Sequence, residues 1–126
     1  MSPPPPLRQR LRTALDQARK ARDLTAVAAL RSTLGSIDNA EAVDPASAPA
    51  ASSEVVAGAV DGLGATEATR RSLSEADITS IVEAEIAERL DAAATYDGAG
   101  RPDRAGALRA ETAVLTAVLQ HSDARR

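Results

Sequence analysis

Apolar residues recur every three or four positions along much of this chain, which is the spacing of one face of a helix. The first stretch spans residues 7–22. Its apolar stripe consists of Leu7, Leu11, Ala14, Leu15 and Ala18. This pattern predicts an amphipathic helix that buries the stripe and exposes the polar residues between its members.

A second stretch with the same period covers residues 24–42. Asp23 stands directly before it and is a favourable N-cap. The predicted buried face comprises Leu24, Val27, Leu30, Leu34 and Ile37. Gly35 lies inside this helix at a cost of about 1 kcal/mol relative to alanine, and we expect its missing side chain to permit a close helix crossing.

Two further helices are predicted, over residues 74–97 and 102–120. Ser74 and Asp77 have the spacing of a capping box, with aspartate in place of the usual glutamate or glutamine. The apolar positions of the third helix are Ile78, Ile81, Val82, Ile86, Leu90 and Ala93, and those of the fourth are Leu108, Leu115, Val118 and Leu119. Gly98 and Gly100 favour an end to the third helix, and Pro102 suits the first turn of the fourth.

These elements predict an all-α fold of two antiparallel helical hairpins in a single domain, residues 7–120. Residues 43–72 are rich in Ala, Ser, Pro and Gly, and we expect a long irregular connection or insertion there. The proline run in residues 1–6 predicts a flexible or polyproline-type tail. Residues 121–126 are expected to fray.

Composition narrows the chemistry that the chain can perform. It has no cysteine, which excludes disulfides, thiolate catalysis and cysteine-based zinc sites. Phe and Trp are also absent, so aliphatic side chains must form the core. No apolar stretch is long enough to span a membrane, and the proline run is unlike a signal peptide. We therefore expect a cytoplasmic protein with no membrane partner.

Charge is unevenly distributed. Residues 1–22 hold six basic residues and one acidic residue, a net charge of +5, whereas the remainder carries −8. Arg8, Arg12 and Arg19 lie on one side of the first helix and form a candidate surface for RNA phosphates or for a partner protein. No aromatic residue stands between them to stack on bases. We therefore favour pairing with acids of the third helix, which are Glu75, Asp77, Glu83, Glu85 and Glu88.

Two other polar groups are candidates for a ligand site, and both have a structural interpretation that we favour. Arg31, Asn39 and Glu41 share the second helix and are expected to form an internal polar network.

Tyr96, Arg101 and Asp103 surround the turn between the third and fourth helices. We expect Tyr96 to cover the end of the hairpin and Asp103 to stabilise the start of the fourth helix. The alternative is a small recognition corner.

No catalytic or metal-binding pattern is recognisable. Glu83, Glu85, Glu88 and Asp91 lack a histidine at a suitable spacing, because the single histidine is His121. The glycines at positions 58, 62 and 64 lack the Lys-Ser/Thr of a phosphate-binding loop. We therefore predict that the chain alone is not an enzyme and uses no cofactor or metal.

Several short motifs occur together in a familiar order. Leu30-Arg31 is followed by Asn39-Ala40-Glu41, and the later matches are Arg89, Tyr96, Ala99-Gly100-Arg101, Asp103, Glu111 and Leu115. In this order, over residues 7–41 and 73–119, the chain resembles the YqeY-like family, which is related to the tail of the B subunit of the tRNA-dependent amidotransferase. The most specific segment runs from Ala94 to Asp103.

The resemblance implies a non-catalytic helical accessory module, associated with tRNA or with an amidotransferase complex. Carbon–nitrogen ligase chemistry, with glutamine as amido donor, belongs to the multi-subunit enzyme and not to this kind of domain. The family pattern continues into a second helical subdomain, and we expect a short form without it. The alternative function is a protein-interaction or self-association module, such as a homo-oligomer, with no role in nucleic-acid binding.

Overall fold

The computed structural model describes residues 2–42 and 72–124, with side chains described as far as residue 121. These residues form four helices and no strand, which confirms the all-α prediction. The helices are α1 (Leu7–Ala21), α2 (Leu24–Ala42), α5 (Glu75–Gly98) and α6 (Pro102–Ala124). Helix α6 is therefore four residues longer than predicted. The expected irregular connection, apart from residue 72, lies outside the described residues.

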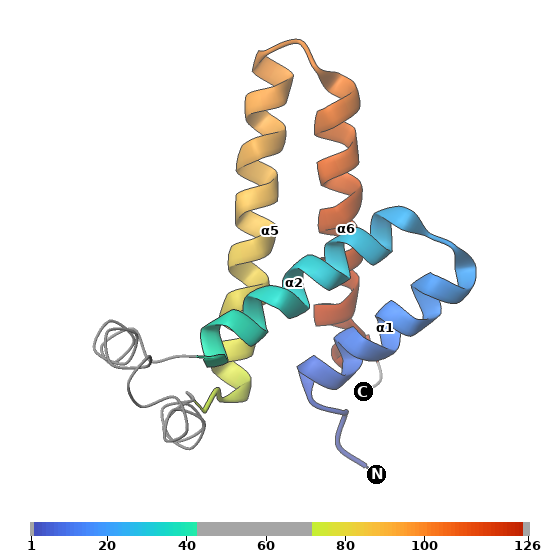
Figure 1. Cartoon of the computed structure of the whole chain (residues 1–126), viewed down its shortest axis with the longest axis vertical. Coiled ribbons are helices and arrows are strands. Elements are labelled where there is room, and N and C mark those ends of the chain that lie inside the picture. Colours follow the sequence, from blue (N-terminus) through green and yellow to red (C-terminus); the bar gives the residue numbers. More distant parts are fainter. Residues whose placement is uncertain (1, 43–71, 125–126) are drawn as a thin grey trace, which may run out of the picture.

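The helices form two hairpins, α1–α2 and the longer α5–α6 (Figure 1). Helix α2 crosses α5 and α6 near one end of the long hairpin and packs against both, while α1 packs mainly against α2. The other end of α5–α6 projects beyond α2 as an arm, whose tip is the turn at residues 99–101. The α1–α2 turn also projects from the body, as a separate corner.

The core lies where the two hairpins cross. Its most deeply buried large side chains come from all four helices and include Leu7, Leu11, Leu30, Ile37, Val82 and Leu115. The predicted apolar faces therefore meet one another, as helix periodicity requires. The aliphatic side chains of this cluster supply the hydrophobic stabilisation without help from large aromatic residues.

Two predicted core positions are wrong. Leu24 is 78% exposed and Leu90 is 46% exposed. Leu24 lies in the first turn of α2, at the projecting corner where α1 has already ended. Leu90 lies in the half of α5 that projects past α2, and the last α5 residue that packs against the core cluster is Ile86. Both side chains thus have the predicted period but lie outside the core cluster.

Local capping signals are confirmed. The Ala26 N–H donates to Asp23 Oδ1 at 3.1 Å, so Asp23 caps α2. Ser74 and Asp77 exchange reciprocal hydrogen bonds of 3.0 Å, which completes the capping box of α5. The start of α1 has a long-range cap instead, because the Leu7 N–H donates to Glu75 Oε2 at 2.7 Å. That bond fixes α1 relative to α5.

The glycines differ in what they contribute. Gly100 has a φ of +73° in the arm turn, a conformation that favours glycine. Gly35 does not mediate a close crossing, because a Cβ added there would have no atom of the described residues within 4 Å, apart from its own neighbours and local helix backbone. The expectation for Gly35 is therefore wrong.

Candidate nucleic-acid interface

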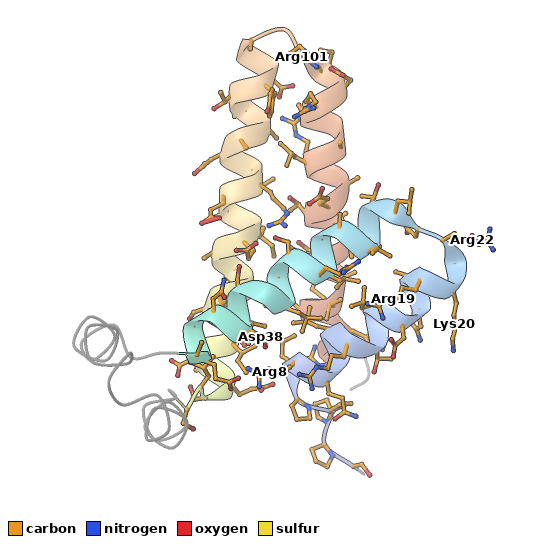
Figure 2. The ribbon with its side chains drawn as sticks, viewed as in Figure 1. Arg8, Arg19, Lys20, Arg22, Asp38 and Arg101 are labelled. Carbon is orange, nitrogen blue, oxygen red and sulfur yellow. The ribbon has the colours of Figure 1, made fainter. Side chains whose placement is uncertain are left out.

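Arg8 is neutralised by α2. Its Nη2 lies 3.0 Å from Glu41 Oε2, and about a fifth of the Arg8 side chain is exposed. Asp38, one helical turn before Glu41, is on the same end of α2 (Figure 2). The predicted pairing of Arg8 with acids of α5 is therefore wrong. Arg8 is a structural residue that ties α1 to the last turn of α2.

Arg10 is also structural, although the sequence did not single it out. Its Nη1 donates to the carbonyl oxygen of Val118 at 2.6 Å, and its Nε donates to that of Pro5 at 3.1 Å. The guanidinium therefore links the N-terminal tail and α1 to α6. The sequence does not distinguish Arg10 from the neighbouring arginines, because its partners are backbone carbonyl oxygens that come close to it only in the folded protein.

The remaining cations of this region stay exposed: Arg12, Arg19, Lys20 and Arg22. Arg19 contacts Asp16 at 3.9 Å, a long separation for an ion pair between two exposed side chains. Arg12, Lys20 and Arg22 form no side-chain ion pair or hydrogen bond with any residue of the described ranges. Their charges are therefore not engaged in a direct ion pair within the described ranges.

We call Arg19, Lys20 and Arg22 the basic corner, because they lie at or beside the α1–α2 turn (Figure 2). Lys20 and Arg22 extend away from the body of the molecule in different directions. Asp23, the acid nearest in sequence to Arg22, is engaged as the cap of α2.

The opposite end of the same hairpin is acidic. Asp38 and Glu41 lie in the last turns of α2, and Glu75 of α5 reaches the first residue of α1. Within the α1–α2 hairpin, Lys20 and Arg22 therefore lie at one end and Asp38 and Glu41 at the other, while the exposed Arg12 and Arg31 lie between them. An anionic ligand is attracted to the corner rather than to the whole length of α1.

The predicted network of Arg31, Asn39 and Glu41 does not form. Arg31 and Asn39 are exposed on α2 and have no side-chain partner among the described residues, while Glu41 pairs with Arg8. The network does not form because Arg31 and Asn39 lie on the face of α2 that is exposed to solvent, whereas the opposite face of the helix packs on the core.

Instead, the structure builds a polar network from residues of three helices. Arg89 of α5 donates from Nε to Glu111 Oε1 of α6 at 2.9 Å and from Nη1 to Glu85 Oε1 at 2.8 Å. Ser36 of α2 donates from Oγ to Glu85 Oε2 at 2.8 Å. The side chain of Arg89 is only 10% exposed. Arg89 and Glu111 both matched the family pattern, but nothing in the sequence spacing identified Ser36 as a further member of the network, bound to Glu85.

Arg89 remains charged in this setting. Burial opposes the charged form, but the hydrogen bonds to Glu85 and Glu111 outweigh that effect and raise the pKa of Arg89 above its ordinary value. All four network side chains have partners within the protein. The network therefore fixes the crossing of α2 with the long hairpin and offers no free group for chemistry.

The arm turn is a self-contained structure. Tyr96 is half-buried, and the Arg104 guanidinium lies over its ring at 5.3 Å from the centroid. The Arg101 N–H donates to the Tyr96 carbonyl at 2.8 Å, and Arg101 Nε lies 3.5 Å from Asp103 Oδ1.

A further pair spans the arm. Arg109 donates to Asp97, and this hydrogen bond lowers the pKa of the Asp97 carboxyl. Arg101 and Arg109 of the arm thus pair with carboxylates, whereas Arg104 stacks on the uncharged ring of Tyr96.

A hollow of about 410 Å³ lies between the N-terminal tail, α1 and the end of α6. Its apolar lining includes Pro5, Ala14 and Val118, and its polar lining includes Gln17 and His121. None of its lining residues within the described ranges carries a carboxylate. Within residues 2–42 and 72–121, no three His, Cys, Asp or Glu side chains are grouped as metal ligands, so Glu83, Glu85, Glu88 and Asp91 form no such group.

Comparison with known proteins places this structure in a family. The model of the YqeY-like family, described as "Yqey-like protein", matches residues 55–122, which is 68 of the 126 residues. No curated protein and no solved structure matches the chain. Among the described helices, none is long and apolar enough to cross a membrane. The matched region contains all of α5 and most of α6, including Arg89, Tyr96, Arg101 and Glu111. The chain belongs to the YqeY-like family.

Proposed function

We propose that the chain is a non-catalytic accessory module that binds tRNA through the basic corner, with Arg12 extending the surface along α1. The observation that carries this proposal is the gathering of exposed cations at one end of the α1–α2 hairpin, where Lys20 and Arg22 have no ion-pair partner among the described residues. The resemblance to the tail of the amidotransferase B subunit supports tRNA as the nucleic acid. In that role the chain presents tRNA to an amidotransferase and contributes no catalytic group.

Electrostatics limits the affinity. The protein has a net charge of −3, so an RNA is repelled by most of the surface and attracted by the corner. Each phosphate that is neutralised releases bound counterions, and three to four such contacts predict a slope of about −2 to −4 for log K against log salt concentration. We expect weak binding that is measurable at low salt and lost at raised salt.

A salt titration tests this proposal. Fluorescence anisotropy of labelled tRNA is measured with the purified protein at a series of salt concentrations. A linear decrease with the stated slope supports the proposal. The absence of binding at low salt, or an affinity independent of salt, contradicts it.

One observation favours the alternative function. The hollow between the tail, α1 and α6 has a largely apolar lining and suits an apolar segment of a protein partner or of a second copy of this chain. Association at that surface is driven by apolar burial and tolerates salt. Size-exclusion chromatography at low and raised salt, with and without tRNA, distinguishes a salt-tolerant oligomer from a salt-sensitive RNA complex.

A further inference from the structure

Two residues at the basic corner are placed unfavourably for the stability of the isolated protein. Arg22 has φ 57° and ψ 36°, in the left-handed region where glycine is favoured at the end of a helix. Leu24, two residues later, is the most exposed of the large hydrophobic side chains in the described part of the chain, at 78%. The turn thus presents a guanidinium and an aliphatic side chain to solvent at the same point.

We infer that the basic corner recognises unpaired nucleotides of RNA, with Leu24 packing against the face of a base while Lys20 and Arg22 contact the flanking phosphates. This inference rests on the proposed function and specifies which part of an RNA the corner binds. In a paired region the base faces are covered by stacking, so an exposed leucine gains nothing from a duplex. In a loop the base faces are accessible, and every base offers one.

The shape of the corner favours a loop over a folded protein partner. The α1–α2 turn projects from the body, and Lys20 and Arg22 extend from it in different directions (Figures 1 and 2). A stable protein interface needs about 800 Å² on each partner, which one leucine on a convex turn does not provide. A flexible strand can instead bend around the turn and place successive phosphates near successive cations.

Two RNA probes separate the loop contact from the general electrostatic contact. One is a stem–loop with an unstructured loop, and the other is a blunt duplex with the same number of phosphates. The test variant is Leu24→Gln, which keeps the charge and a reasonable helix propensity. The matched control is Leu90→Gln, because Leu90 is the other exposed large aliphatic side chain among the described residues and lies on the arm. Thermal melts verify that both variants are folded.

We expect Leu24→Gln to weaken stem–loop binding about fivefold, in line with the loss of the apolar area that a partly buried leucine covers, and to leave duplex binding unchanged. Leu90→Gln should change neither affinity. Arg22→Gln should weaken binding to both probes, since phosphates are common to both.

Each other outcome has a distinct meaning. If the wild-type protein binds neither RNA at low salt, the proposed function fails and this inference fails with it. If Leu24→Gln binds the stem–loop as well as the wild type does, or loses affinity equally for both probes, the inference is overturned while RNA binding stands. If an acidic peptide with aliphatic residues displaces the stem–loop from the wild type but not from Leu24→Gln, the corner is a protein-docking site and the inference is overturned.

Discussion

Thr33 shows how a single residue limits the stability of the core. Its side chain is fully buried, and Oγ1 has no hydrogen-bond partner in the described residues. A buried hydroxyl without a partner carries a desolvation penalty, and valine has the same shape without it. We expect Thr33→Val to raise the free energy of unfolding by about 1 kcal/mol in a urea titration. Thr33→Ser keeps the hydroxyl and loses a methyl group, so a stabilising effect of serine would contradict this explanation.

Glycines allow a second residue-scale prediction. A Cβ at Gly106 would meet no atom of the described structure within 4 Å outside its local helix, and the same holds for Gly35. Alanine at either helical position should therefore stabilise the protein by about 0.5–1 kcal/mol. Gly100→Ala should destabilise it by about 1 kcal/mol because of the positive φ. Thermal melts of the three variants measure these shifts, and a stabilising Gly100→Ala would contradict the account.

Residues with local partners were predictable from the sequence, and residues with distant partners were not. Asp23 and Ser74 cap helices through atoms three residues away, so their roles follow from spacing alone. Arg8 and Arg10 bind groups on other helices, and their partners depend on how the hairpins cross. This is why the sequence grouped Arg8 with Arg12 and Arg19, whereas the structure separates it from them.

At the scale of elements, the four helices and their buried faces followed from apolar periodicity. Periodicity reports the direction of a face but not where a neighbouring helix begins or ends. Leu24 and Leu90 keep the correct period and are nevertheless exposed, because α1 ends before the first and α2 does not reach the second. The length of the arm was therefore not predictable from the pattern of either helix alone.

The network around Arg89 joins α2, α5 and α6, and its removal should weaken their packing. Arg89→Met leaves Glu85 and Glu111 close to each other without their shared cation. We expect a loss of about 3 kcal/mol in the free energy of unfolding, measured by urea denaturation, at the lower end of values for largely buried pairs. Arg12→Met is the control, because Arg12 is exposed and should change stability little. Equal effects of the two substitutions would show that the network does not hold the helices together.

The ion pair across the arm should make a pH-dependent contribution. The hydrogen bond from Arg109 lowers the pKa of Asp97 below its ordinary value. A depressed carboxyl pKa stabilises the folded protein above the unfolded-state pKa, and this stabilisation is lost as the pH falls through the folded-state value. The difference in stability between the wild type and Arg109→Gln should therefore be present at neutral pH and disappear in strong acid. Urea titrations at several pH values measure it, and a difference that grows on acidification would contradict the assignment.

At the scale of the whole molecule, the structure moves the candidate site away from the set that the sequence proposed. Arg8 is engaged at the acidic end of the α1–α2 hairpin, whereas Arg19, Lys20 and Arg22 form the basic corner at the other end. The excess of positive charge in residues 1–22 was visible in the sequence. The sequence did not show that this positive charge is concentrated at the corner, because the distribution of charge depends on which acids folding brings to each end of the hairpin.

Binding of tRNA to a matched pair of triple variants tests the central claim most directly. One variant replaces the basic corner with glutamine at Arg19, Lys20 and Arg22. The other replaces Arg31, Arg101 and Arg104 and so removes the same charge from exposed positions elsewhere. We predict that the corner variant loses measurable tRNA binding at low salt, while the control retains most of the wild-type affinity. Equal losses for the two variants would show that only net charge matters and would contradict a site at the basic corner.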